Sequence, residues 1–249
     1  MSLRRVLFNL TKTNSVFSLR FKNQKLYYYY VDKSNFPLII LTNALQYSSE
    51  SPSKCWNCNF ISKSELFCSK CKVLQEPPEN LTYFDIMGIP KSYDVTVSEV
   101  QKKYKELQKL LHPDKFSRKS EKEKELSDHF SSLVNKAYST LSHPLKRGLY
   151  MLKLNNVMIS EETDNVNAVF LMEIMEKNEE IDEAENNEEK IKKLVEENER
   201  ILSNLTKNVG DAFRKEDIKK AETLLIQMKY YDTINNRLKK LKHDLGIIE

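Results

Sequence analysis

Apolar residues recur at intervals of three and four along most of the chain beyond residue 96. In the first such stretch, Val100, Tyr104, Leu107 and Leu111 form one stripe, which is the spacing of a helix that buries one face. Only 4 of the 249 residues are glycine and 31% are charged, a composition that suits helices and provides few of the turns that sheets need. We therefore expect a mostly α-helical chain.

Two antiparallel helices are predicted to enclose a polar tip. Thr96 and Glu99 form a capping-box pattern at the start of the first helix. Pro113 should end this helix, because proline lacks an N–H group and biases the preceding residue away from helical angles. The second helix has one apolar face, which consists of Leu126, Phe130, Leu133, Ala137 and Leu141. The pair should hold His112, Pro113 and Asp114 on the surface at their common end.

All four cysteines lie in one short stretch, as two pairs that each enclose two residues: Cys55 and Cys58, then Cys68 and Cys71. This spacing is typical of two knuckles that place four thiolates around a tetrahedral metal ion. Disulfides are the alternative, which a mitochondrial or cytosolic compartment disfavours. We predict a small zinc ribbon-like module with one structural zinc per chain, since four sulfur ligands leave no open position. Trp56 and Phe60 beside lysines leave a nucleic-acid-binding ribbon as an alternative, although no recognition helix accompanies them.

The first 31 residues contain lysine and arginine but no acidic residue. Such a composition is typical of a mitochondrial presequence, so we expect a location in the mitochondrial matrix, with an additional cytoplasmic pool left open. A disordered basic tail without a targeting role is the alternative. The apolar run FPLIILTNAL is shorter than the roughly 20 residues that span a bilayer, so no membrane helix is expected.

Three further amphipathic stretches follow, at roughly 166–184, 188–213 and 217–245. The second and third each have one apolar stripe, made of Ile191, Leu194, Asn198, Ile201, Leu205, Val209 and Phe213 in one and of Ile218, Ala221, Leu225, Met228, Tyr231, Leu238 and Leu241 in the other. Short joints near Asn186 and near Gly210 to Glu216 should make neighbouring helices antiparallel. These features predict a three-helix bundle.

The first helix of this bundle has more apolar surface than one stripe can bury. Phe170, Ile174, Ile181 and Ala184 can face the bundle. Three other apolar residues are displaced around the helix toward acidic residues: Leu171, Met172 and Met175 lie toward Glu176, Glu179 and Glu183. A partner-binding surface is one interpretation, since methionine suits adaptable binding surfaces. A broad core face, or packing against the preceding helices, is the other.

The segment around the polar tip resembles the J-domain co-chaperones. The resemblance rests on His112-Pro113-Asp114 between two long helices, on Tyr83-Phe84, on Asn135-Lys136-Ala137-Tyr138, and on Pro144 to Tyr150 as the start of a fourth helix. It implies that Asp114 and His112 engage a DnaK-type chaperone, that Pro113 rigidifies the loop, and that docking is coupled to ATP hydrolysis in the partner. Lys102, Lys105 and Lys109 would then meet an acidic surface of that partner.

The cysteine pairs, the J-like segment and the bundle together resemble the HscB family. Most of the resemblance is carried by CWNC, LVNKAYSTL, RGLYMLKL and FLMEIMEKNEEIDEAE. It implies a mitochondrial co-chaperone that binds an IscU-type iron-sulfur scaffold and delivers it to a mitochondrial DnaK-type chaperone. It also implies the scaffold-binding residues, which are Leu171, Met172, Met175, Glu176, Glu179, Glu183 and Tyr230. The tyrosine run YYYY is unusual for the family's presequence.

The expected organisation has four parts: a presequence and disordered segment at 1–50, the zinc module at 51–76, a four-helix J domain at 79–155 and the bundle at 163–246. Pro77 and Pro78 should separate the module from the helices. A J-domain protein with a general folding client remains an alternative. His129, His143 and His243 lie on separate segments and no glycine-rich phosphate loop is present, so we expect no enzymatic activity. Neither nucleic acid nor a membrane is expected as a partner.

Overall fold

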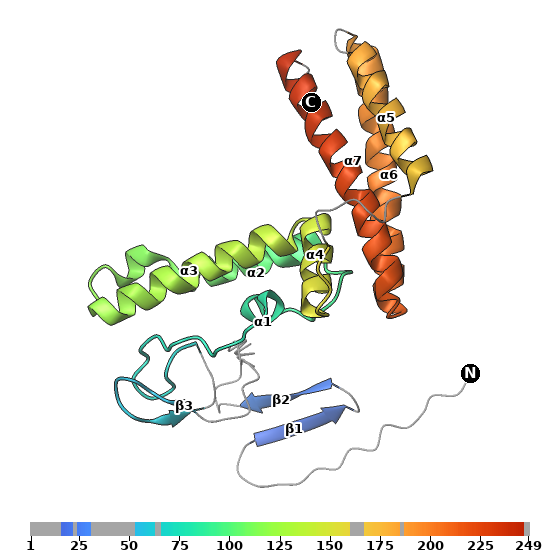
Figure 1. The fold of residues 1–249 in the computed structure, drawn as a ribbon. Helices are drawn as coiled ribbons and strands as arrows, with labels where there is room; N and C mark the ends of the chain where they lie inside the picture. The colour runs from blue at the N-terminus through green and yellow to red at the C-terminus, as the bar shows by residue number, and fades with distance from the viewer. Residues whose placement is uncertain are drawn as a thin grey trace. The chain divides into compact units, whose positions relative to one another are not determined.

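The computed structural model describes residues 16–21, 24–30, 53–62, 66–159, 167–184 and 187–246. The chain forms two compact units, residues 1–44 and residues 45–249. All α-helices among the described residues lie in the second unit (Figure 1), and the predicted mostly α-helical fold is confirmed. None of the helices in the described ranges is long and apolar enough to cross a membrane.

The first unit contains an antiparallel pair of strands, β1 (Val16–Phe21) and β2 (Gln24–Tyr30), in which Val16 lies opposite Tyr30. Aromatic residues favour the extended conformation, and the tyrosine run is part of β2. These strands differ from the disorder that we expected for this segment. The targeting role stays a prediction, and most of the segment 1–50 lies outside the described residues.

Around the cysteines the structure is a small two-knuckle module. Its strands β3 (Ser53–Lys54) and β4 (Ile61–Ser62) pair antiparallel, and an isolated bridge joins Phe67 and Leu74. The prolines after this module do not separate it from the helices as we expected. Leu66 and Leu74 are buried and belong to the same apolar core as the helical residues that follow. The module and the helices thus share apolar packing across the two prolines, and the boundaries of the module stay a prediction.

The four helices of the J-like segment are present, with a 3-10 turn at the polar tip. Their bounds are α1 (Tyr83–Met87), α2 (Val97–Leu111), η1 (Pro113–Phe116), α3 (Glu121–Leu141) and α4 (Pro144–Leu154). Thr96 caps α2 by accepting a hydrogen bond from the Glu99 N–H, which is the first of the two bonds of the predicted capping box. The helix ends directly before His112 and Pro113. Phe130, Ala137 and Leu141 of the predicted apolar face are buried.

The predicted three-helix bundle is formed by α5 (Ala168–Glu183), α6 (Glu188–Arg214) and α7 (Ile218–Asp244). Ile191, Leu205 and Val209 of α6 are buried, and so are most members of the α7 stripe. One boundary differs, because α6 continues through Gly210 to Arg214. A Cβ on Gly210 would lie 2.7 Å from an Asp94 carboxylate oxygen. This glycine therefore permits a close approach to the J-like segment and does not end the helix.

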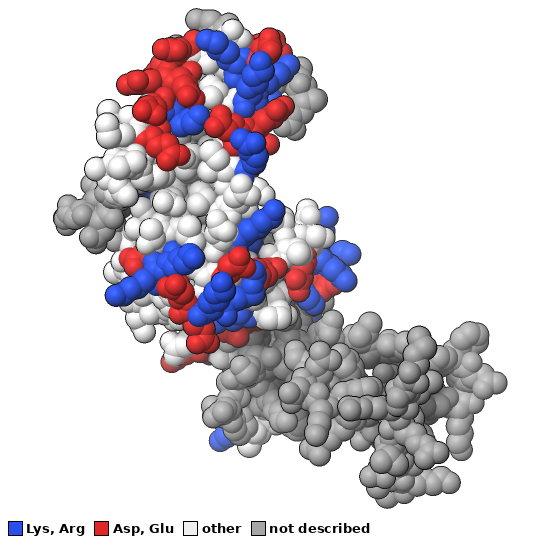
Figure 2. Space-filling model, turned by 90° about the vertical axis from the view of Figure 1, so that its right-hand side faces the viewer, with Lys and Arg blue, Asp and Glu red and all other residues white. Residues whose placement is uncertain are grey.

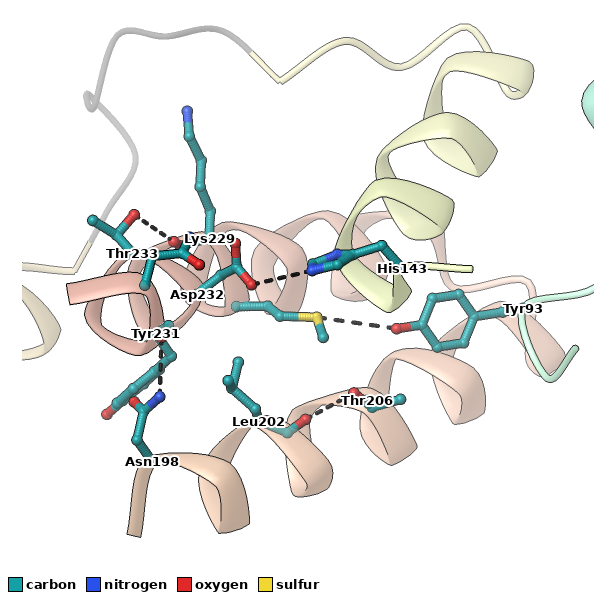
Figure 3. A network of polar contacts seen from close by, with 11 residues as sticks. Tyr93, His143, Asn198, Leu202, Thr206, Lys229, Tyr231, Asp232 and Thr233 are labelled. Carbon is teal, nitrogen blue, oxygen red and sulfur yellow. Dashed lines mark hydrogen bonds and ion pairs between the residues drawn. The ribbon is translucent and has the colours of Figure 1, made fainter. Parts of the chain in front are cut away.

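The J-like segment packs against the bundle. The rings of Tyr93 and Phe213 stack with centroids 5.5 Å apart. The Tyr93 hydroxyl lies 4.0 Å from the Met228 sulfur, and His143 at the start of α4 points toward Asp232 of α7 with an Nε2–Oδ1 distance of 3.6 Å (Figure 3). Because these contacts join α4 and the α1–α2 loop to α6 and α7, the two helical parts share one core.

Candidate functional site

The polar tip lies between α2 and α3, where the sequence places it. The side chains of His112 and Asp114 are 54% and 90% exposed. The Asp114 N–H donates a hydrogen bond to His112 Nδ1 over 3.3 Å, and Pro113 fixes the first position of the 3-10 turn. The Lys115 ammonium donates to the carbonyl of Lys109, which satisfies one of the free carbonyls at the end of α2. The tip is thus held by bonds from its own side chains to the backbone, while the His112 and Asp114 side chains stay accessible to solvent.

A row of lysines runs along the exposed side of α2 toward this tip. Lys102, Lys105 and Lys109 are all exposed. They line a shallow open hollow together with Ser98, Gln101 and Glu106. The predicted basic surface is therefore available for contact with an acidic partner.

The cysteine knuckles have the same backbone geometry. The Asn59 N–H donates to the Cys55 carbonyl over 3.0 Å, and the Lys72 N–H donates to the Cys68 carbonyl over 2.9 Å. Asn59 and Lys72 both adopt left-handed conformations, with φ of 55° and 60°. Each of these residues directly follows the second cysteine of its pair, so the chain turns sharply back and brings both thiols of the pair together.

The four sulfur atoms converge on one point, and all lie within 4.8 Å of one another. The Cys55 and Cys71 sulfurs are 3.6 Å apart, and those of Cys58 and Cys68 are 3.7 Å apart. A tetrahedral ion with metal–sulfur bonds of about 2.3 Å requires sulfur–sulfur distances of about 3.8 Å. The spacing of the thiols therefore fits a metal ion, and among the residues that the structure describes these cysteines form the group of ligands suited to one.

The environment of the thiols favours partial ionisation. Desolvation opposes ionisation of Cys55, but hydrogen bonds from the N–H groups of Cys58 and Asn57 outweigh it and lower the pKa of Cys55 to about 6. The Val73 N–H lowers the pKa of Cys71. Although the Phe60 N–H acts in the same direction on Cys58, desolvation and the neighbouring sulfurs raise the pKa of Cys58 to about 12. Full ionisation of the cluster therefore needs a cation at its centre.

The surplus apolar residues of α5 lie on the surface. Phe170, Ile174 and Ile181 face the bundle and are buried, as the periodicity predicts, whereas Met172 and Met175 are 64% and 62% exposed. Glu176, Glu179 and Glu183 are exposed as well, and Leu171 is partly buried. Figure 2 shows acidic side chains gathered at the end of the bundle that is uppermost in Figure 1, next to an uncharged surface. The interpretation of the methionines as core residues is therefore wrong.

Tyr230 of α7 is partly buried and packs against α5. Its ring meets the buried Phe170 of α5 edge to face, with centroids 5.6 Å apart, and its scaffold-binding role stays a prediction. The sequence analysis missed Val169, which is 72% exposed. Its position three residues before Met172 is the helical spacing that could have indicated it. We call Val169, Leu171, Met172, Met175 and Tyr230 the apolar patch.

Trp56 is not free to stack on a nucleic-acid base. Its Nε1 donates to the Leu74 carbonyl over 2.8 Å, and the Lys122 ammonium lies 4.9 Å from its ring centroid. The ring thus packs between the metal module and α3. Phe60 is 41% exposed, and the Lys70 ammonium lies 5.9 Å from its ring centroid.

Comparison with known families accounts for most of the chain. The DnaJ domain matches residues 82–150, and the HSCB C-terminal oligomerisation domain matches residues 166–239. The chain is 41% identical over 211 residues to the iron-sulfur cluster co-chaperone protein HscB of Mus musculus, covering 82% of this chain and 88% of that protein. It is 35% identical over 198 residues to the HscB homolog of Arabidopsis thaliana, with 78% and 77% covered.

A solved structure has the same fold. The crystal structure of human co-chaperone protein HscB superimposes with a TM-score of 0.71 at 38% sequence identity, and the match covers 76% of this chain and 98% of that one. The chaperone HscB from Vibrio cholerae, at 23% identity and a TM-score of 0.61, agrees in fold. The order of the J-like helices and the bundle is thus a shared architecture.

Proposed function

The chain belongs to the HscB family of iron-sulfur cluster co-chaperones, and on this basis we propose that it delivers an iron-sulfur scaffold to a DnaK-type chaperone. In this proposal the apolar patch and its acidic border bind an IscU-type scaffold. His112, Pro113 and Asp114 dock on the chaperone and stimulate its ATPase, which promotes transfer of the cluster. ATP hydrolysis takes place in the partner, and this chain has no catalytic activity of its own.

One observation carries the proposal: two exposed surfaces of different chemistry lie on separate parts of one core. The tip is polar and is preceded by a row of lysines, which suits an acidic partner. The patch on α5 and α7 is apolar and borders on carboxylates, which suits a second partner. Two separate surfaces allow one molecule to hold the scaffold and the chaperone together, which raises the effective concentration of one at the other.

The cluster of four cysteines supports a bound zinc ion. Cys55, Cys58, Cys68 and Cys71 would hold it, and the ion would act as a cross-link that stabilises the module, since four sulfur ligands leave no position for a substrate. Metal analysis should give one zinc per chain. Absence of zinc, or an absorption band of an iron-sulfur cluster, would contradict this assignment.

The place of action follows from the proposed partners and from the basic, acid-free composition of the first 31 residues. We infer import into the mitochondrial matrix. Fusion of residues 1–50 to a fluorescent reporter tests this, and a reporter that stays in the cytosol would contradict it.

The decisive experiment is a steady-state ATPase assay of a mitochondrial DnaK-type chaperone. This protein and an IscU-type scaffold are added separately and together. We expect modest stimulation by this protein alone, little by the scaffold alone, and more than the sum when both are present. If the ATPase rate with both proteins equals the sum of the separate stimulations, the proposed delivery of the scaffold is contradicted. The same stimulation with an unrelated unfolded client would indicate a general folding role.

A further inference from the structure

Lys122, in the first turn of α3, is held by the metal module. Its ammonium lies 4.9 Å from the ring centroid of Trp56 and 2.7 Å from a carboxylate oxygen of Glu76. These two residues come from opposite ends of the module. The indole in turn donates to the carbonyl of Leu74 over 2.8 Å. A cation between an aromatic face and a carboxylate is attracted by both, so the module is attached to α3 at one defined point.

Apolar packing supports the same attachment. Leu66 and Leu74 are 5% and 0% exposed, and they belong to one continuous core with Phe116 of the 3-10 turn. Trp56 and Phe67 pack against this core. The module therefore covers part of the J domain near the beginning of α3.

The same part of α3 is tied to the docking tip. The Ser127 hydroxyl donates to the carbonyl of Leu111 over 2.8 Å, and both residues are fully buried. Leu111 is the residue directly before His112. Ser120 caps the helix by accepting from the Glu123 N–H. The start of α3 thus contacts the module through Lys122 and the end of α2 through Ser127.

We propose that Trp56 and Lys122 are positioning residues that connect the metal module to the His-Pro-Asp loop. The binding energy of a structural metal is also folding energy for a module of this size. When the metal is lost, Trp56, Leu74 and Glu76 lose their fixed positions, and the first turn of α3 loses its cover. Terminal turns open locally at low cost, and here the opening reaches His112 through the bond between Ser127 and Leu111. The effect on the chaperone rests on the proposed function, whereas the effect on the loop does not.

Hydrogen exchange of the full chain, followed by mass spectrometry, tests the connection directly. We expect removal of the metal by a chelator to raise amide exchange several-fold across residues 111–127. Exchange in α7 should change less than two-fold. Unchanged exchange across 111–127 in a protein that has lost its metal would overturn the proposal, since the module would then be independent of the loop.

Point variants separate the connection from loss of the module. Lys122→Met keeps all four cysteines, and we expect full metal content together with several-fold faster exchange at 111–123. Lys124→Met is the matched control, because Lys124 lies in the same turn and its ammonium pairs with Glu121 at 2.7 Å without contacting Trp56. Lys122→Arg should behave as the wild type, since it keeps the cation. Equal effects of Lys122→Met and Lys124→Met would overturn the role of Lys122.

The chaperone assay adds a functional readout. Lys122→Met should lower stimulation of the ATPase two- to five-fold and leave the Kd for the scaffold unchanged, since α5 is not involved. Full stimulation by this variant, despite its faster exchange, would overturn the link to docking. If the wild-type protein itself fails to stimulate the chaperone while exchange still responds to the metal, the proposed function fails and the connection between module and loop is retained.

Discussion

The His112 side chain is exposed, and the hydrogen bond that its Nδ1 accepts from the Asp114 N–H is one that a glutamine oxygen can also accept, so its chemistry can be changed without disturbing the core. We expect His112→Gln to change the free energy of unfolding by less than about 0.5 kcal/mol, as exposed substitutions usually do. Stimulation of the chaperone should be abolished, because the imidazole is proposed to contact the partner. Urea unfolding and the ATPase assay measure the two effects. A well-folded variant that stimulates normally would reject the assignment of the tip.

The exposure of the methionines on α5 allows an equally direct test of the scaffold surface. We predict that the triple variant Leu171→Ala, Met172→Ala and Met175→Ala keeps its helical content and its basal stimulation of the chaperone. Scaffold binding should be lost, because each side chain buried at the centre of a contact contributes about 1 to 3 kcal/mol. Tyr230→Ala should have a milder effect, since this ring lies at the border of the patch.

Calorimetry of scaffold titrated into the variant, beside a thermal melt, separates binding from stability. Val97→Ala combined with Leu110→Ala is a suitable control, because these side chains are 49% and 47% exposed on α2 and lie outside the patch. Wild-type affinity of the triple variant would remove the patch from the proposed site. A collapsed melt would instead mean that these residues support the core.

Among the elements, α5 depends on polar contacts to keep its place. Arg237 of α7 donates to the Asn178 side-chain oxygen over 3.0 Å and pairs with the Asp182 carboxylate. The Tyr231 hydroxyl donates to a Glu173 oxygen over 2.5 Å. Burial, followed by this contact with Glu173, raises the pKa of Tyr231, so the phenol remains a donor at physiological pH. These bonds fix the rotation of α5, and with it the direction of the apolar patch.

We therefore predict that Arg237→Ala loosens α5 selectively. The free energy of unfolding should fall by about 1 kcal/mol or less, because the ion pair is partly exposed. Amide exchange in α5 should rise more than in α6, and scaffold affinity should weaken with it. Hydrogen exchange and calorimetry check both effects, with Lys239→Ala on the exposed side of the same helix as control. Equal exchange in α5 of the two variants would contradict the prediction.

Element positions could be predicted where local chemistry decides them. Pro113 predicts the end of α2, and the spacing of Phe170, Ile174 and Ile181 predicts the buried side of α5. Gly210 could not be interpreted from local sequence. A glycine that ends a helix and a glycine that lets another segment approach closely look the same in the sequence. Here the neighbour is Asp94, which is distant along the chain and close only in the fold.

In the candidate sites, too, the features set by local sequence could be predicted, and those set by distant contacts could not. The tip and the cysteine pairs are short contiguous patterns, and the sequence predicts the exposed tip between α2 and α3 and the clustering of the four thiols, whereas their binding roles stay predictions. The surface position of Met172 and Met175 was left open, since periodicity shows how many faces are apolar but not how many are covered. The contact of Trp56 with Lys122 could not be predicted, because it depends on how the module packs against α3.

At the scale of the whole molecule, the J domain and the bundle meet at Tyr93, whose ring stacks on Phe213 of α6, and at the neighbouring Asp94. Arg147 of α4 supports the Tyr93 ring from within the J domain: it is 4% exposed, and its guanidinium carbon lies 5.0 Å from the ring centroid. Desolvation lowers the pKa of Arg147 and raises the pKa of Tyr93 to about 12. Arg214 pairs with Asp94 over 2.5 Å. Such a junction holds the polar tip and the apolar patch on one connected core.

Gly148 is the point at which this junction can be opened by a single substitution. A Cβ at this position of α4 would lie 2.4 Å from a terminal carbon of Leu225 on α7. Leu225 is 0% exposed, so its side chain cannot turn out into solvent to make room. We predict that Gly148→Val forces α4 away from α7, at a cost of about 1 to 3 kcal/mol, as is usual for overpacking.

The functional consequence should appear only when both partners are present. With Gly148→Val, stimulation of the chaperone without scaffold and the Kd for the scaffold should each stay within two-fold of the wild type, because neither surface is altered. The extra stimulation that the scaffold provides should be lost, because the distance and orientation between the two partners would have changed. Ser132→Val, which adds the same side chain on the exposed surface of α3, serves as control. The distance between spin labels on α2 and α6 shows whether the junction has moved. If this distance changes while the scaffold still adds its extra stimulation, delivery does not require a fixed junction.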